Sequence, residues 1–229
     1  MKSIIVLFFT VFTLPLMAQT NQSSRSLVHV TGEGKVTVTP DQVSIKVRVE
    51  HQGKDAVTVK NQNDVAIDAV IKFLRAEGID NSDVQTEYIN LNKSYEYKTK
   101  TYNYTANQAL TILVKDLAKY ETIMSGLLNS GINRIDGVQF KSSKASSLKE
   151  EARVKAMTDA KQRAVTYAAA LGQSIGKAVE ISEQGANVPQ PQYRRAALTA
   201  EASFDGGGEA IAPGELTILI IVAVSFELN

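Results

Sequence analysis

The chain has 229 residues, enough for one large domain or two small ones, and 44% of them are hydrophobic. The 25 Lys and Arg residues nearly balance the 24 Asp and Glu residues, and without the segment up to Ala18, which holds one lysine and no acid, the charges cancel. A neutral chain lacks the concentrated basic face that nucleic acid requires. The absence of cysteine excludes disulfides, thiol nucleophiles and thiolate metal sites.

The N-terminus has the pattern of a secretory signal. Lys2 precedes an apolar run from Ile4 to Met17, which at 14 residues is shorter than the roughly 20 that span a bilayer. We expect residues 1–18 to be a signal peptide cleaved after Ala18, and residues 19–26 to be a flexible mature N-terminus. The protein is then periplasmic or secreted, with no transmembrane segment after cleavage. An uncleaved membrane anchor is the alternative.

Residues 28–50 predict two strands joined by a tight turn at Pro40–Asp41, and we expect the rest of the chain to cover or extend this hairpin. Its apolar residues recur with period two, at Val28, Val30, Val36, Val38, Val43, Ile45, Val47 and Val49. Gly32 and Gly34 interrupt the first strand. Glycine within a strand usually indicates a bulge or the close approach of another backbone.

Residues 56–78 then show the three- and four-residue spacing of an amphipathic helix. A second hairpin follows, with strands 84–97 and 102–115 around the turn 98–101. Pairing Tyr97 with Tyr102 predicts a register that places Tyr95 opposite Tyr104 and Ile89 opposite Leu110. In this register, four tyrosines near the tip share one face: Tyr95, Tyr97, Tyr102 and Tyr104.

The second half of the chain predicts two helices and three strands. Asp116 is placed to begin a helix that closes at Gly131, and residues 132–142 predict a strand. Ser147 to Glu150 form a capping box that opens a long helix ending near Gly172. This helix carries a stripe of small residues that permits close packing: Ala152, Ala156, Ala160, Ala164 and Ala168.

A short strand is predicted at residues 179–182, and residues 185–214 form a long loop that we expect to be mobile and cut first near Arg194–Arg195. The last strand, 215–228, is apolar on both faces, which predicts cover on both sides. We therefore expect a homo-oligomer, buried in part through Ile218, Ile220 and Val222.

The predicted fold class is α+β, with antiparallel strands in hairpins packed against long amphipathic helices, as a single domain over residues 27–229.

Side chains that could do chemistry are sparse. His29 and His51 are the only histidines, and neither has an acid or a second histidine at ligand spacing, so packing or surface roles are favoured over a metal site. Glu150 and Glu151 suggest paired acids, but a helix N-terminus favours negative charge in any case. We predict no catalytic residue, no cofactor and no metal.

Two stretches resemble the SIMPL-domain family, whose bacterial members include periplasmic immunogenic proteins. The first is the pattern Val-x-Gly-Glu-Gly-x-Val-x-Val-x-Pro-Asp at residues 30–41, and the second is the helix at residues 146–164 followed by Leu171–Gly172. The likeness extends over roughly residues 27–229. It implies an export signal, an α+β fold with paired sheets and long helices, self-association, and a loose link to oxidative stress. It implies no catalytic residues.

Two functions stay open at this point. The first is an exported, non-enzymatic envelope protein that self-assembles and acts by binding or scaffolding, with an envelope protein or a glycan as partner. The second is an envelope hydrolase or carbohydrate-binding enzyme whose acids converge only in the folded chain. The four tyrosines are equally open to two interpretations, either a ladder that stabilises its own hairpin or a surface that docks on a partner.

Overall fold

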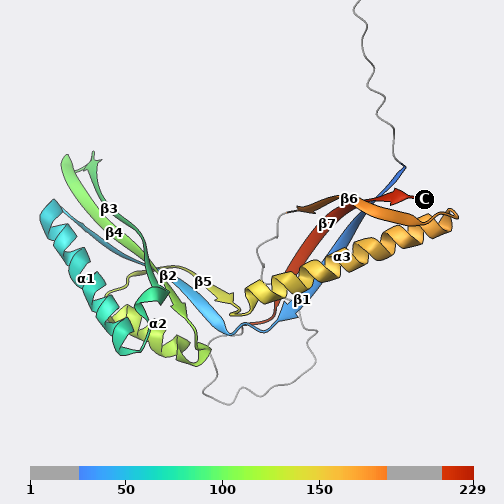
Figure 1. Ribbon diagram of the computed structural model, residues 1–229. Helices are drawn as coiled ribbons and strands as arrows, with labels where there is room; N and C mark the ends of the chain where they lie inside the picture. The colour runs from blue at the N-terminus through green and yellow to red at the C-terminus, as the bar shows by residue number, and fades with distance from the viewer. Residues whose placement is uncertain (1–25, 185–212) are drawn as a thin grey trace, which may run out of the picture.

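The computed structural model describes residues 26–184 and 213–229 (Figure 1). Two predicted segments lie outside the described residues. They are the signal peptide with its cleavage position, and nearly all of the loop at 185–214 with Arg194–Arg195. The described chain forms two antiparallel sheets and three α-helices, which confirms the α+β fold class. Figure 1 shows these elements as two lobes, one built around each sheet.

The first lobe contains the four-stranded sheet, in the order β3-β4-β2-β5. Its elements are β2 (Gln42–Gly53), α1 (Ala56–Ala76), β3 (Val84–Glu96), β4 (Thr101–Val114), α2 (Tyr120–Asn129) and β5 (Arg134–Lys141). One-turn 3₁₀ helices, Asn81–Asp83 and Leu117–Lys119, precede β3 and α2. Alternate residues of β2 and β4 pack with α1 and α2 in one core, as the period-two pattern predicts.

The second lobe contains the three-stranded sheet, in the order β1-β7-β6, with α3 against one face. Its elements are β1 (Leu27–Val38), α3 (Ala145–Ala170), β6 (Ile175–Gln184) and β7 (Leu216–Leu228). Its core shares no residue with that of the first lobe. Each lobe is therefore a sheet with its own helical cover.

The predicted hairpin of residues 28–50 is wrong. β1 pairs along its whole length with β7, from Leu27 opposite Glu227 to Val38 opposite Leu216, whereas β2 pairs with β4 and β5. The chain between β1 and β2 passes from one lobe to the other instead of folding back. A period-two pattern defines which face of a strand is buried, but it does not identify the neighbouring strand.

Gly32 and Gly34 let α3 approach the backbone of β1, which is the second of the two roles expected for them. A Cβ atom added to Gly34 would lie 1.8 Å from the Ala152 carbonyl oxygen, and one added to Gly32 would lie 2.1 Å from the Ala156 carbonyl oxygen. The predicted alanine stripe is completely buried on the facing side of α3. Glycine on the strand and alanine on the helix together bring the two backbones into contact.

α1 begins at its expected residue, α2 closes at its expected glycine and α3 ends near Gly172 as expected, but α3 begins earlier than expected. Asp55 accepts a hydrogen bond from the Thr58 N–H at 2.8 Å, and Gly131 has φ +108° just after α2. The capping box at Ser147 and Glu150 is wrong, because α3 begins earlier, at Ala145. The Ser147 hydroxyl instead donates to the Lys144 carbonyl at 2.9 Å.

The predicted register of the second hairpin is displaced by two residues. Tyr95 lies opposite Tyr102, and Lys93 lies opposite Tyr104, because the pair that closes the turn is Glu96–Thr101 instead of Tyr97–Tyr102. Lys100 adopts φ +51° in that turn, a conformation that lysine seldom takes and that the sequence therefore does not indicate. Between Tyr88 and Glu96 a displacement of two residues preserves the face of each side chain, so Tyr95, Tyr102 and Tyr104 still share one face.

Candidate interaction surfaces

The tyrosine tip is the exposed end of the β3–β4 hairpin, and we define it as Tyr95, Tyr97, Tyr102 and Tyr104 with Lys93, Lys98 and Lys100. The Tyr95 ring packs against the Tyr97 ring at 5.1 Å and against the Tyr102 ring at 5.0 Å between centroids. The Nζ atom of Lys93 lies 3.9 Å from the centre of the Tyr102 ring. The rings thus form a cluster, with Tyr97 in the turn and not on the strand.

Three of these tyrosines are nevertheless open to solvent. Tyr97 is 83% exposed, Tyr102 is 52% exposed and Tyr95 is 41% exposed, whereas Tyr104 is half-buried. Ile89 and Leu91, on the same face of β3, are exposed as well. The cluster therefore stabilises its own hairpin and still presents apolar area outward.

The three β7 residues expected at a contact between copies lie inside the chain. Ile218, Ile220 and Val222 are buried under α3, against the alanine stripe. Their neighbours Leu219 and Ile221 point to the opposite face of the sheet and are half-buried. Since both faces of β7 are apolar, the sequence could not decide which set α3 would cover.

This opposite face of the second sheet, which we call the open face, is centred on Leu219 and Ile221. In the part of the chain that the structure describes, α3 is the only helix of this lobe, and it lies on the other side. Lys35 is paired with Leu219 and Glu33 with Ile221, and both charged residues are exposed. The open face thus has an apolar centre with one cation and one anion beside it.

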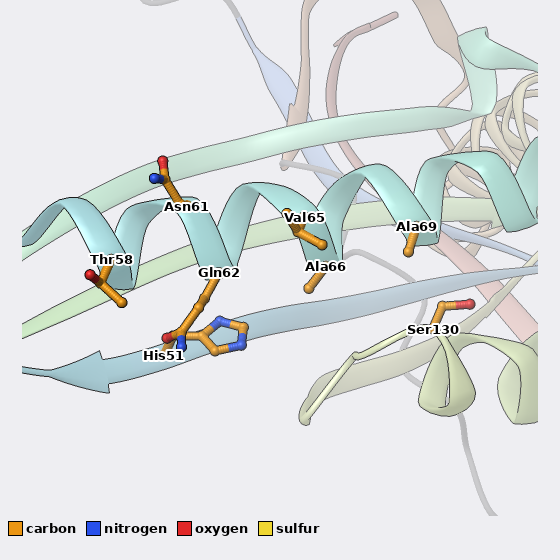
Figure 2. A pocket seen from close by; sticks show the side chains of 8 residues that line it. All are labelled: His51, Thr58, Asn61, Gln62, Val65, Ala66, Ala69 and Ser130. Atoms are coloured by element: carbon orange, nitrogen blue, oxygen red, sulfur yellow. The ribbon is translucent and has the colours of Figure 1, made fainter.

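His51 lies in a groove of about 630 Å³ between α1 and the end of β2. Figure 2 shows the imidazole below α1, with Gln62 directly above it and Ser130 at the far end of the groove. The other lining residues are Thr58, Asn61, Val65, Ala66 and Ala69. The buried Nδ1 atom of His51 has no hydrogen-bond partner among the described residues. The groove offers polar side chains but no second metal ligand.

His29 belongs to the other lobe, so the two histidines do not form one site. Its Nδ1 atom lies 2.7 Å from the Ser225 hydroxyl, at a hollow of about 270 Å³ on the open face. Within residues 26–184 and 213–229, no three His, Cys, Asp or Glu side chains gather as a metal site would require. No carboxylic acid is among the buried polar residues of those same ranges.

Glu150 and Glu151 are engaged in ion pairs along α3. Glu150 pairs with Arg153, which also binds Glu183 on β6 at 2.8 Å, and Glu151 pairs with Lys155 at 2.7 Å. Hydrogen bonding to Arg153 lowers the pKa of the Glu183 carboxyl. These contacts are structural, since they stabilise the helix and fasten it to an edge strand.

The two segments that connect the lobes are held together by Asp41. Its backbone N–H donates to the Lys141 carbonyl at 3.1 Å, and its carboxylate accepts from the Ser143 N–H at 2.7 Å and from the Ser143 hydroxyl. The hydroxyl bond and then the backbone bond hold the pKa of the Asp41 carboxyl below its ordinary value. Pro40–Asp41, which was expected to be a hairpin turn, is instead the crossing between lobes.

Acidification should release this contact. Asp41 has a lower pKa in the folded than in the unfolded chain, so its contribution to stability is complete above the unfolded value of about 3.9 and is lost as the pH falls through the folded value. Ser143→Ala should raise the pKa of the Asp41 carboxyl, as measured by carboxyl-carbon NMR titration. Ser143→Ala should also lower the free energy of unfolding at neutral pH. It should leave that free energy unchanged below the folded-state pKa of Asp41. Ser143→Thr, which keeps the hydroxyl, is the control, and an unchanged Asp41 titration in Ser143→Ala would contradict the assignment.

Comparison with known proteins places these features in a family. The family model described as "SIMPL: Protein of unknown function (DUF541)" matches residues 28–226, which is most of the chain. The chain belongs to the SIMPL family. The resemblance carried by residues 30–41 and 146–164 is therefore confirmed. In the SIMPL fold seen here, the first stretch supplies the strand under α3 and the crossing between lobes.

Among the relatives is the 26 kDa periplasmic immunogenic protein of Brucella melitensis, 31% identical over 95% of this chain and 92% of the relative. The uncharacterized protein YggE of Edwardsiella ictaluri is 25% identical over 77% of this chain and 76% of the relative. YggE of Escherichia coli K12 is 26% identical over 71% and 68%. The relative named as periplasmic confirms the expected location, periplasmic or secreted.

None of the helices in the described ranges is both long and apolar enough to cross a bilayer.

Proposed function

We propose that this protein is a non-enzymatic protein of the bacterial envelope that self-assembles and acts by binding or scaffolding. The observation that supports this proposal is the open face of the second sheet. The SIMPL relatives, one named as periplasmic and others as uncharacterized, are in keeping with such a role. A contribution to oxidative-stress tolerance is implied by the family resemblance alone.

The outer faces of the two sheets differ in kind. In the first lobe, the face away from the helices carries the ion pairs Arg48–Asp136 at 2.7 Å and Lys46–Glu87 at 3.1 Å, as is typical of a solvated surface. In the second lobe, the corresponding face has Leu219 and Ile221 at its centre. Covering such side chains lowers the free energy by about 25 cal/mol for each Å² of apolar area removed from water. This gain favours a partner on the open face.

The charges on the open face favour a second copy of the chain as that partner. Glu33 and Lys35 lie on the same face of β1, separated in sequence by Gly34. They are paired with Ile221 and Leu219. Two copies related by a two-fold axis present the same patch to each other, so Lys35 of one copy meets Glu33 of the other while the aliphatic residues pack between them. The contact is then self-complementary in charge.

Light scattering after size-exclusion chromatography of residues 19–229 tests the assembly. We expect a molar mass that is a multiple of the chain mass at micromolar concentration, and we expect Leu219→Lys combined with Ile221→Lys to yield monomers, since each buried ammonium costs several kcal/mol. Val154→Lys, at an exposed position of α3, is the matched control and should leave the mass unchanged. A wild-type chain that stays monomeric would overturn the proposal.

The alternative of an envelope hydrolase finds no support in the described residues. Hydrolysis by paired acids needs two carboxyl groups in one pocket, at least one with a raised pKa. The carboxyl groups with resolved shifts, Asp41, Asp55, Glu87, Asp159 and Glu183, all have lowered pKa values because they accept hydrogen bonds. These acids are held ionised and engaged, which suits a structural role.

A further inference from the structure

The tyrosine tip joins a large exposed apolar area to an excess of positive charge. Beside the tyrosines, Ile89 is 66% exposed and Leu91 is 47% exposed on the same face of β3. An apolar stripe therefore runs from the turn along the edge of the first sheet. Isolated apolar residues are common on protein surfaces, but apolar residues gathered along one face, here interrupted only by Lys93, mark a contact surface.

The charges at this end of the lobe are mostly lysines. Lys93, Lys98 and Lys100 belong to the hairpin itself, and Lys54 follows Gly53, which is paired with Tyr104 at the same end of the sheet. Two acids accompany them: Glu96, whose carboxylate accepts a hydrogen bond from the Lys98 N–H at 3.2 Å, and Asp55, which follows Lys54 and caps α1. In a chain with a net charge of only +1, this end is locally cationic and suits an anionic partner.

The arrangement of the rings favours a lipid surface over a sugar. Carbohydrates stack on free ring faces, but Lys93 covers one face of Tyr102, and Tyr95 meets Tyr97 at 88°, edge against face. Figure 1 shows the β3–β4 hairpin ending freely at one end of the first lobe, so the tip is a projection. At a bilayer interface, by contrast, tyrosine rings enter at the headgroup level with their hydroxyls hydrated, and lysines extend to the phosphates.

We propose that the tyrosine tip docks on a bilayer surface rich in anionic phospholipid. The Tyr97 and Tyr102 rings enter the headgroup region, and Lys98 and Lys100 bind lipid phosphates. Ile89 and Leu91 lie against the surface behind them. This inference is independent of the proposed assembly, because the tip belongs to the first lobe and the open face to the second. An assembled protein could therefore present several tips to one membrane.

Co-sedimentation of the mature chain with vesicles tests the proposal. We expect binding to vesicles of equal parts phosphatidylglycerol and phosphatidylcholine, much weaker binding to phosphatidylcholine alone, and a marked loss at 1 M salt. Lys98→Gln with Lys100→Gln should weaken binding by about 25-fold, or about fivefold for each lysine. The matched control removes the same charge from exposed positions of the second lobe, with Lys161→Gln and Lys177→Gln, and should bind as the wild type does.

Tyr97→Ser separates the apolar contribution from the charge. Because this residue is in the turn and 83% exposed, and loses only its ring contact with Tyr95, the variant should lower the melting temperature slightly and bind vesicles several-fold less tightly. Equal weakening by both lysine pairs would indicate nonspecific attraction and overturn the proposal. Binding to insoluble glycan in place of vesicles, lost in Tyr97→Ser, would also overturn it. So would a Tyr97→Ser variant with an altered molar mass and normal vesicle binding, which would assign the tip to a contact between copies.

Discussion

Gly34→Ala should lower the free energy of unfolding of the second lobe by at least about 3 kcal/mol. The new methyl group would lie 1.8 Å from the Ala152 carbonyl oxygen and 2.6 Å from the Ala156 amide nitrogen. Both atoms belong to the backbone of α3, so no side-chain rotation can relieve the overlap. The helix must move away from β1 along several turns, which opens the core that the alanine stripe fills.

Thermal unfolding followed by circular dichroism measures this loss, and Gly137→Ala is the control. Gly137 is also a strand glycine, in β5, but a Cβ atom there meets nothing within 4 Å. Tyrosine fluorescence adds a readout for the other lobe, because six of the eight tyrosines lie between residues 42 and 141. A Gly34→Ala variant with a melting temperature equal to that of Gly137→Ala would contradict the close packing of α3 on β1.

Leu127→Ala should lower the free energy of unfolding of the first lobe by about 2–5 kcal/mol. The Leu127 side chain is completely buried in the core where α2 meets the sheet, together with Ile123. Its truncation leaves a cavity that the surrounding strands cannot fill, and the loss includes both the apolar transfer and the cavity. Urea unfolding monitored by tyrosine fluorescence reports this lobe directly.

The adjacent residue provides a close control. Leu128 is on the same helix and undergoes the same chemical change, but it is 50% exposed, so Leu128→Ala should cost less than about 1 kcal/mol. The two cores have no residue in common, so Leu127→Ala should destabilise only the first lobe and Gly34→Ala only the second. The double variant should show both losses of unfolding free energy in full. Similar losses for Leu127→Ala and Leu128→Ala would mean that α2 is not packed as described.

Local patterns predicted the elements of this fold with good accuracy. Alternation from Val43 to Val49 marked the buried face of β2, and the spacing from residue 56 marked α1 up to Gly78. The alanine stripe and the two strand glycines each predicted close packing. These predictions succeeded because the burial period of a helix or strand is a property of neighbouring residues and is visible in a single sequence.

The arrangement of the strands could not be predicted in the same way. β1 and β2 are adjacent in sequence and each has an alternating apolar face, so local patterns were consistent with a hairpin. The actual partner of β1 is β7, at the far end of the chain. The hairpin register shifted by two because Lys100 adopts a left-handed conformation that glycine or asparagine would have signalled. Pairing depends on contacts between distant residues, which one sequence does not reveal.

The candidate surfaces were predicted in part. The exposure of Tyr97, Tyr102 and Tyr95 fits a contact surface, although Tyr97 lies in the turn and not on the strand. On β7 the strand was recognised, but the apolar residues available to a partner are Leu219 and Ile221 and not Ile218, Ile220 and Val222. The groove at His51 was missed, because its lining comes from β2, α1 and Ser130 after α2, which meet only in the folded chain.

The pairing of β1 with β7 also determines the order in which the protein can fold as it emerges from a ribosome or a translocation channel. The four-stranded sheet needs only residues 42–141 and can form while the remainder is still being delivered. The three-stranded sheet must wait for residues 216–228, the last strand of the chain. Until then β1 has no partner, and its long sequence separation from β7 makes this closure the slow step. Truncation of the last strand should therefore leave a folded first lobe joined to an unfolded second one.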